Sequence, residues 1–272
     1  MDTAKKIRLS RILNPDSKRS VIVPIDHGLT LGPIAGIEST VRMVPWIGND
    51  GINAIIAHKG IVVRLVERDL LRGRGVVLQL NGMNSLAQKP DYKEMLTSLE
   101  TAARLGVDAV SVQINFTGEN DNSNWKLLGQ VVDEASQLGF PVLTMLYDKK
   151  SNLDSAPNRE RFRQLLRVAV ELGTDAIKIA MPDNMAILPE ILSPVCEDAM
   201  IFLAGGEATD SGKLLAQVSC AMSLGASGVC MGRNVFSNRN PERFLRELAA
   251  VVHGRTEAPD QTRSMHREAI HA

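Results

Sequence analysis

One phrase recurs along the chain and constrains the fold more than any other feature. In each copy an apolar helical stripe ends in Leu-Gly, and a short, apolar, β-rich run follows within three or four residues. The copies read AARLGVDAVSV at 102–112, AVELGTDAIKI at 169–179 and AMSLGASGVCM at 221–231, with a shorter echo, EASQLGFPVLTM, at 134–145. Because glycine readily takes the left-handed conformation that ends a helix, each copy is predicted to be a helix-to-strand joint.

The spacing of these joints predicts the architecture. Gly106, Gly139 and Gly173 lie 33 and 34 residues apart, which is room for one strand, one helix and two loops. Apolar strands that alternate with helices indicate a parallel sheet covered by helices. Eight strands are predicted, at 21–25, 53–57, 76–80, 109–114, 141–146, 176–180, 200–204 and 228–232. Eight units favour a single α/β domain of the (β/α)8 or TIM-barrel type, although pattern alone leaves an open doubly wound sheet as the alternative.

The predicted barrel occupies residues 1–255, and residues 256–272 lose the apolar periodicity. We expect this last segment to be a flexible or subunit-contacting tail. The chain of 272 residues, 44% of them hydrophobic, is long enough to bury a large core.

Charge and cysteine content narrow the class of partner. Thirty-one basic and 31 acidic residues cancel, which gives no reason to expect nucleic acid or a membrane as a partner and favours a small molecule. The three cysteines (Cys196, Cys220 and Cys230) lack a Cys-x-x-Cys spacing, so neither a disulfide framework nor a zinc site is indicated. The start of the chain is charged and no apolar run reaches about 18 residues, so we expect a cytoplasmic protein without an export signal.

The stretch DAIKIA at 175–180 places Lys178 between two isoleucines of the sixth predicted strand. Strand alternation points the isoleucines outward and the lysine into the barrel. Burial disfavours the charged form, so we expect a lowered pKa for Lys178 and a neutral amine that condenses with carbonyls. The alternative is a snorkelling lysine paired with Asp26 or Asp183, but its position in a barrel strand favours catalysis.

Tyr147 and Asp26 are the other catalytic candidates, since both follow predicted strands at the end where such barrels carry their chemistry. The phenol of Tyr147 can relay a proton to or from a substrate hydroxyl, or it can be an aromatic plug. The Asp26 carboxylate can act as a base or orient a hydroxyl, or it can cap the loop that follows.

A phosphate site is predicted after the seventh and eighth strands, where many barrels of this type bind phosphate. The expected groups are Gly205, Gly206, Gly232 and Arg233. Glycines allow the backbone N–H groups to approach the anion closely, and an arginine can hold two of its oxygens. The alternative is a tight Gly-Gly turn and an arginine paired with a carboxylate.

The remaining strand ends carry further polar side chains that we expect to line the substrate pocket: His27, His58, Lys59, Asn81, Gln113 and Asn115. The two histidines raise the possibility of a metal site, but no third ligand follows at helical spacing and a lysine nucleophile makes a metal unnecessary. We therefore expect no metal and no other cofactor. Lys59 is the rival nucleophile, and its place between histidine and glycine suggests a wet loop.

Taken together, six segments resemble the archaeal-type (DhnA) class I aldolases. They are VIVPIDHGLTLGP, IIAHKGIV, TMLY, DAIKIA, LAGGE and MGRNVF, and the resemblance runs from about residue 7 to residue 253. RLSRILNPDSKRSVIVPIDHG and AHKGIV are most similar to the branch that contains 2-amino-3,7-dideoxy-D-threo-hept-6-ulosonate synthase and 2-amino-4,5-dihydroxy-6-oxo-7-(phosphonooxy)heptanoate synthase. The resemblance implies a (β/α)8 barrel that assembles as a homo-oligomer, commonly a decamer.

The same resemblance implies roles for particular residues. Lys178 matches the Schiff-base lysine, Tyr147 the proton-relay tyrosine and Asp26 the acid or base of the first strand. The glycines at 205, 206 and 232, with Arg233, match the phosphate-binding segments. The implied activity joins a ketose-phosphate donor, with dihydroxyacetone phosphate favoured, to an aldehyde acceptor, with aspartate semialdehyde favoured, toward an aminohydroxybenzoate-type product.

Alternatives within the fold are a fructose-bisphosphate aldolase, a transaldolase-type heptulosonate synthase and a thiolase-like acyl transferase. A phosphosugar-binding protein without catalysis is a further alternative, which the presence of Asp26, Tyr147 and Lys178 argues against. Departures from the family pattern bear on substrate choice. Gln113 stands where the synthases tend to have histidine, AGGEAT replaces AGGPKT, and the lysines at 149 and 150, like Lys59, are candidates to orient an acceptor carboxylate.

Overall fold

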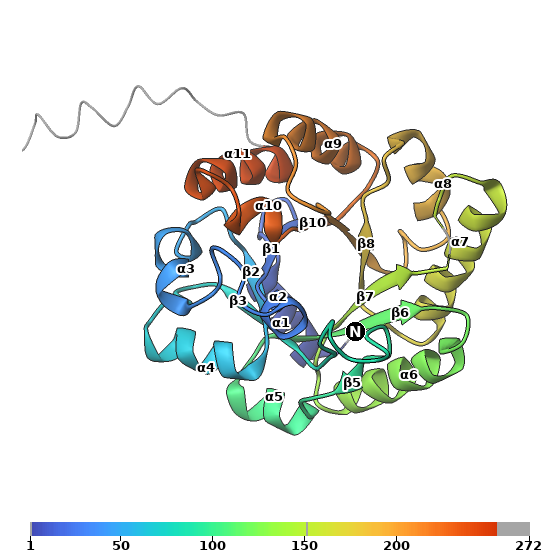
Figure 1. The fold of residues 1–272 in the computed structure, drawn as a ribbon, viewed down its shortest axis with the longest axis horizontal. Helices are drawn as coiled ribbons and strands as arrows, with labels where there is room; N and C mark the ends of the chain where they lie inside the picture. The colour runs from blue at the N-terminus through green and yellow to red at the C-terminus, as the bar shows by residue number, and fades with distance from the viewer. Residues whose placement is uncertain (1, 151, 255–272) are drawn as a thin grey trace, which may run out of the picture.

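Eight parallel strands close into a barrel with helices around it (Figure 1). The computed structural model describes residues 2–150 and 152–254, so the predicted tail at 256–272 lies outside the described residues. The barrel order is β1-β10-β9-β8-β7-β6-β3-β2, which confirms the predicted (β/α)8 fold over the open sheet. The bounds are β1 Ser20–Pro24, β2 Ala54–Ala57, β3 Gly75–Gln79, β6 Ala109–Phe116, β7 Val142–Asp148, β8 Ala176–Ala180, β9 Met200–Ala204 and β10 Gly228–Cys230.

The Leu-Gly joints end helices as predicted. Gly106, Gly139, Gly173 and Gly225 all have positive φ, the conformation that a glycine adopts most readily. The outer helices are α3 Thr40–Ile47, α4 Lys59–Glu67, α5 Leu99–Leu105, α6 Asp121–Gln137, α7 Ala156–Glu171, α8 Leu188–Leu192, α9 Ser211–Ser223 and α11 Pro241–His253. Shorter helical turns are α2 His27–Leu31, η1 Met185–Ile187 and α10 Arg233–Phe236. Each outer helix faces the strands with its apolar side, which buries the larger of two cores.

The amino ends of the strands are closed by α1 (Thr3–Ile12), which crosses the centre of the ring in Figure 1. Leu9 and Ile12 of this helix are buried against Ile22, Val77 and other inward side chains of the barrel. Ion pairs fasten the helix at its sides, since Lys5 Nζ lies 2.9 Å from Asp175 and Arg11 Nη1 lies 2.9 Å from Asp108. The charged start of the chain is therefore a plug for one end of the barrel.

The opposite end, which we call the mouth, carries a small hairpin between β3 and α5. β4 (Asn81–Gly82) pairs antiparallel with β5 (Glu94–Met95). The backbone N–H groups of Leu96 and Thr97 both donate to the carbonyl of Leu80, at 2.8 and 3.0 Å. The segment between Leu80 and Leu96, which we call the excursion, therefore leaves and rejoins the barrel at the same point. Lys59 Nζ donates to the carbonyl of Leu96 at 2.7 Å and ties α4 to this hairpin.

Within residues 2–150 and 152–254, none of the helices is both long and apolar enough to cross a membrane.

Candidate active site

Strand alternation separates side chains inside the barrel from those under the helices. Ile177 and Ile179 belong to the outer core, whereas Ala176, two residues before Lys178, belongs to the inner cluster with Met145, Phe202 and Cys230. Successive side chains of a strand point to opposite faces, so Lys178 points inward, as predicted from DAIKIA. The same parity directs the ends of the other strands inward: Asp26, His58, Asn81, Gln113, Asn115 and Tyr147.

Lys178 is the buried cation of the barrel interior, with 6% of its surface exposed. Its register partners are Met145 and Phe202, and Nζ lies 3.9 Å from the sulfur of Met145. Burial lowers the pKa of Lys178, but nearby Cys230, Tyr147 and Asp26 raise it by more, so the pKa lies above its ordinary value. The expectation of a lowered pKa is therefore wrong, because it considered the apolar neighbours in sequence and missed the acidic groups across the barrel.

The thiol of Cys230 is one of the groups that raise the pKa of Lys178, so its own protonation state bears on the charge of the site. Burial raises the pKa of Cys230 to about 11, so this side chain is a neutral thiol at pH 7. Tyr147 and Asp26 are the other two groups that raise the pKa of Lys178. Lys178 must give up a proton before its nitrogen can attack a carbonyl.

Asp26 lies at the end of β1 with two histidines nearby. Its side chain does not cap the short helix α2, so the loop-capping alternative is not what the structure shows. His27 Nδ1 lies 3.5 Å from Asp26 Oδ1, and the charge of Asp26 also acts on His58. Burial lowers the pKa of both histidines despite this carboxylate, so both are neutral at pH 7. Among the described residues, no three His, Cys, Asp or Glu side chains gather closely enough to hold a metal ion.

A buried polar ladder lines the side of the barrel formed by β3 and β6. The Nε2 of Gln79 donates to Asn81 Oδ1 at 2.9 Å, and Asn81 in turn holds the backbone of Gln113 through two hydrogen bonds. Gln113 Nε2 donates to Asn115 Oδ1 at 3.0 Å, and Asn115 Nδ2 donates to Asp91 at 2.8 Å. The predicted pocket residues Asn81, Gln113 and Asn115 are thus fixed by one another, and the last of them reaches the hairpin above the mouth.

The predicted phosphate segments meet between β9 and β10. Gly206 has φ +67, and a Cβ at Gly205 would lie 2.6 Å from Asn234 Nδ2. A Cβ at Gly232 would lie 2.6 Å from the carbonyl of Pro24, so both sites accept only glycine without rearrangement. Arg233 pairs with Glu207 at 3.4 Å and remains partly exposed.

Asn234 joins these two segments and was not predicted as a site residue. Its Nδ2 donates to the carbonyls of Gly205 and Glu207, at 2.9 and 3.1 Å, and its Oδ1 accepts from the N–H of Thr209 at 3.0 Å. The side chain is 4% exposed, so it holds the loop after β9 from inside. The asparagine next to Arg233 was the only signal for this role in the sequence.

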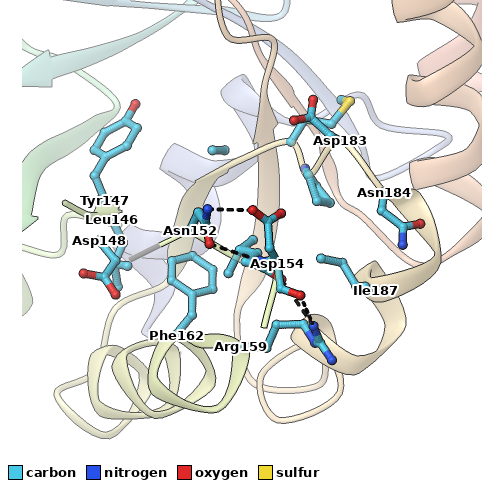
Figure 2. A pocket seen from close by; sticks show the side chains of 14 residues that line it. Leu146, Tyr147, Asp148, Asn152, Asp154, Arg159, Phe162, Asp183, Asn184 and Ile187 are labelled. Carbon is cyan, nitrogen blue, oxygen red and sulfur yellow. Dashed lines mark hydrogen bonds between the residues drawn. The ribbon is translucent and has the colours of Figure 1, made fainter. Parts of the chain in front are cut away.

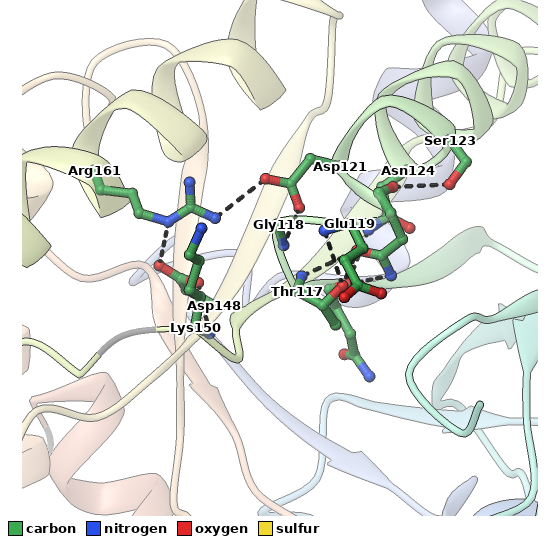
Figure 3. A network of polar contacts seen from close by, with 11 residues as sticks. Thr117, Gly118, Glu119, Asp121, Ser123, Asn124, Asp148, Lys150 and Arg161 are labelled. Atoms are coloured by element: carbon green, nitrogen blue, oxygen red, sulfur yellow. Dashed lines mark hydrogen bonds and ion pairs between the residues drawn. The ribbon is translucent and has the colours of Figure 1, made fainter. Parts of the chain in front are cut away.

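Ion pairs on the outer side of the barrel hold the carboxyl end of β7 in place (Figure 3). Asp148 points away from the barrel and its carboxylate accepts from Arg161 Nε at 2.9 Å. Arg161 also pairs with Asp121 at 3.2 Å, and Asp121 accepts from the N–H of Gly118 at 2.8 Å. The network joins α7, α6 and the loop after β6, and it fixes the strand on which Tyr147 projects inward.

A cavity of about 490 Å³ opens beside Tyr147, between the ends of β7 and β8 and the helices outside them (Figure 2). Its walls include the carboxylates of Asp154 and Asp183 and the ring of Phe162. Asn152 donates to Asp154, and Arg159 donates to the backbone at Leu153 and Asp154. Lys178 does not line this cavity, which adjoins the catalytic candidates on the Tyr147 side.

The barrel has the layout of a lysine-dependent carbon–carbon lyase. Lysine points inward from β8, tyrosine from the neighbouring strand β7, and a carboxylate from the end of β1. A family model described as "DeoC/LacD family aldolase" matches residues 20–238. The chain belongs to this aldolase family, which confirms the resemblance found in its sequence, and it is an enzyme.

Three similar proteins span nearly the whole chain. The 2-amino-3,7-dideoxy-D-threo-hept-6-ulosonate synthase 1 of Archaeoglobus fulgidus is 35% identical, over 92% of this chain and 91% of that protein. The 2-amino-4,5-dihydroxy-6-oxo-7-(phosphonooxy)heptanoate synthase of Streptomyces griseus is 29% identical, over 92% and 90%. The crystal structure of an archaeal fructose 1,6-bisphosphate aldolase superposes with a TM-score of 0.80 at 23% identity, over 93% of this chain and all of that one, and supports the fold.

Proposed function

We propose that this enzyme uses Lys178 to form a Schiff base with a three-carbon ketose phosphate and then joins the resulting enamine to an aldehyde. The observation that carries the proposal is the burial of Lys178 inside the barrel, where Tyr147 and Asp26 both act on it. A buried structural lysine would pair with a carboxylate in hydrogen-bonding contact, whereas the hydrogen-bonding contacts of Lys178 among the described residues are with the sulfur of Met145, the phenol of Tyr147 and the thiol of Cys230.

The proposed reaction begins with loss of a proton from Lys178 to Asp26. The neutral nitrogen attacks the ketone carbon of the donor, and the carbinolamine loses water to give an iminium ion. The iminium accepts the electron pair released when the adjacent C–H bond loses its proton, which gives the enamine. Tyr147 serves as the proton relay in this step and in protonation of the new hydroxyl. The enamine carbon attacks the aldehyde, and water then releases the product from Lys178.

For the donor phosphate we propose the backbone of Gly205, Gly206 and Gly232, with the guanidinium of Arg233. The positive φ of Gly206, with open space where a side chain would stand, supports this assignment, because a backbone N–H group can approach an anion there. Gly205 and Gly232 allow the two loops to pack against Asn234 and the carbonyl of Pro24. Glu207 competes for Arg233 in the free enzyme, so we expect the pair at 3.4 Å to open when the phosphate binds.

For the acceptor we propose aspartate semialdehyde, toward an aminohydroxybenzoate-type product, with dihydroxyacetone phosphate as donor. The similarity to the Streptomyces griseus synthase supports this choice. The cavity beside Tyr147 supports it independently, since Asp154 and Asp183 make no ion pair within the described residues and suit the ammonium of an amino acid. The heptulosonate synthase reaction is the second candidate, and the 35% identity to the Archaeoglobus fulgidus protein favours it.

We also propose a cytoplasmic homo-oligomer, in which residues 256–272 contact a neighbouring subunit. The family resemblance supports this part of the proposal, and light scattering on the full chain and on a chain ending at residue 255 tests it.

Borohydride trapping tests the central chemistry. The protein is incubated with dihydroxyacetone phosphate, reduced and digested, and we expect the donor mass on the peptide that contains Lys178. The acceptor is then identified by consumption of the donor with aspartate semialdehyde, glyceraldehyde 3-phosphate and neutral aldehydes. Absence of the adduct, or a fully retained adduct in Lys178→Met, would falsify the proposed function.

A further inference from the structure

Two lysines flank one carboxylate on the hairpin side of the mouth. Lys149 Nζ lies 3.8 Å from Asp91 Oδ1 and 5.9 Å from the centre of the Tyr147 ring. Lys93 is half-buried on the same hairpin as Asp91, and its Nζ lies 3.5 Å from the carbonyl of Met83, which is the outer limit for a hydrogen bond. These three residues, Asp91, Lys93 and Lys149, form what we call the rim cluster.

The rim cluster faces the reaction site. Asn115 and Tyr147 are partners in the β6–β7 register, and both point into the barrel. Asn115 Nδ2 donates to Asp91 at 2.8 Å, which brings the cluster directly above this layer. Tyr147 is two residues beyond Met145, the register partner of Lys178, so the layer lies about 6.6 Å above the lysine.

The charges of the rim cluster do not balance. One carboxylate, which already accepts from Asn115, stands against two ammonium groups, so the cluster itself, within the part of the chain that the structure describes, carries one positive charge in excess. The pKa of Lys93 is lowered, chiefly because burial disfavours its charged form. The charges of Asp91 and Asp26 offset part of this effect, whereas Lys149 adds to it. Lys93 therefore carries a partly dehydrated charge that a bound anion would stabilise, and it is close enough to the first strand for Asp26 to act on it.

Two further lysines near the mouth, both considered from the sequence, are occupied elsewhere. Lys59 donates to the carbonyl of Leu96 and supports the hairpin. Lys150 lies against Gly118 on the outer side of β7, beside the pair of Asp148 and Arg161 (Figure 3). Of the lysines considered for an acceptor carboxylate from sequence, Lys149 alone belongs to the rim cluster, and Lys93 was missed.

We propose that Lys93 and Lys149 bind a carboxylate of the aldehyde acceptor, an assignment that rests on the proposed aldol function. The single unmatched positive charge suits a monovalent carboxylate better than a phosphate dianion. The site lies across the mouth from the loops of β9 and β10, with β8 and β7 between them in the barrel order. Donor phosphate and acceptor carboxylate are thus held at opposite sides, and the aldehyde carbon falls above Lys178.

Acceptors that differ in one charged group test the site. With dihydroxyacetone phosphate as donor, we compare succinic semialdehyde, butanal and glyceraldehyde 3-phosphate in Lys93→Met, Lys149→Met and the wild type. Loss of one charge-assisted hydrogen bond predicts a KM for succinic semialdehyde raised roughly 10- to 100-fold, with the KM for butanal unchanged. Lys6→Met, which removes an exposed lysine of α1 at the closed end of the barrel, is the matched control and leaves both constants unchanged.

Three outcomes overturn the assignment: an equal effect on succinic semialdehyde and butanal, no effect on either, or an effect confined to glyceraldehyde 3-phosphate. The borohydride adduct of the donor on Lys178 should form in both variants as in the wild type. If the wild type itself forms no adduct, the proposed function has failed, and calorimetric titration with 4-hydroxybutanoate, which has no carbonyl to condense, decides the carboxylate site alone. Weaker binding by tenfold or more in Lys93→Met supports the site, and unchanged binding excludes it.

Discussion

The two ends of the barrel interior differ in almost every physical property. At the amino ends of the strands, Ile12 of α1 packs onto Ile22, Val77 and their neighbours in a closed apolar cluster. At the mouth, the inward positions of the same strands carry Asp26, Asn115, Tyr147 and other polar groups that hold one another in place. Inward residues at one end of a strand can therefore contribute mainly to stability, while inward residues at the other end of the same strand are available for chemistry.

Lys178→Met should have the largest effect and should act on chemistry alone. Methionine keeps the length and most of the volume of the side chain, while removal of the nucleophile should lower kcat by on the order of 10⁵-fold or more. Because a buried charge disappears, the free energy of unfolding should be unchanged or raised. Steady-state rates and urea unfolding measure the two quantities. Lys59→Met is the control, and a similar loss of rate in that variant would contradict the assignment.

Tyr147→Phe should lower kcat by about 10²- to 10⁴-fold, the usual contribution of a positioned proton donor or acceptor. The ring remains, so the fold and the trapped adduct on Lys178 should persist while turnover falls. Tyr92→Phe, at the other tyrosine of the chain, is the matched control and should retain the wild-type rate. An unchanged kcat in Tyr147→Phe would mean that the phenol has no part in proton transfer.

Ile12→Ala should affect only the closed end of the barrel. Ile12 is 4% exposed inside the plug, and loss of a buried isoleucine side chain costs about 2–5 kcal/mol of unfolding free energy. Denaturant unfolding measures the loss, and kcat should stay within a factor of two or so. Ile7→Ala, on the 52% exposed residue of the same helix, should change stability by less than about 0.5 kcal/mol. A large fall in kcat for Ile12→Ala would show that the two ends are coupled.

The pH dependence of borohydride trapping on Lys178 tests the mouth alone, because the groups that shift the pKa of Lys178 lie at that end of the barrel. Its pKa lies above the ordinary value, so the neutral amine is a minor form at pH 7 and its fraction rises about tenfold per pH unit. The rate of borohydride-trapped adduct formation should therefore rise between pH 7 and 9. A rate that is flat over this range would mean that the donor binds to an amine that is already neutral.

The histidines at the mouth should give the smallest effect. The pKa of His27 and of His58 is lowered in the folded state from 6.5, so the unfolded chain binds more protons just below that pH. Stability should be complete above pH 6.5 and should fall as the pH drops through the folded-state values, by at most about 1.4 kcal/mol per pH unit for each group. His58→Gln should flatten this slope in urea unfolding at pH 5 to 7, and an unchanged slope would contradict it.

Sequence reasoning could predict the strands and the direction of Lys178, because both follow from local periodicity. The isoleucines beside Lys178 fix its face whatever the rest of the chain does, and Leu-Gly marks each helix end within a few residues. The pKa of Lys178 depended on Cys230 and Asp26, which lie far away in the chain, so its direction was beyond local reasoning. The plug by α1 was equally hidden, since its charged residues find partners such as Asp175 only after the barrel closes.

The rim cluster was missed for the same reason. Asp91 and Lys93 lie in the excursion between β3 and α5, which shows neither strand nor helix periodicity in the sequence. Nothing near them in the chain indicates that Asn115 and Lys149 will meet them. Asn234 likewise bridges to Gly205 across 29 positions, a contact that exists only because β9 and β10 are neighbours.

The hairpin above the mouth leaves the barrel at Leu80 and returns to the same carbonyl, through the N–H groups of Leu96 and Thr97. Its two ends are therefore already adjacent, and a segment of another length or charge can be inserted there without moving a strand. Exchange of this one segment would therefore change the proposed acceptor site, while the proposed nucleophile and donor site stay as they are. For an engineer, residues 83–95 are the natural cassette to randomise.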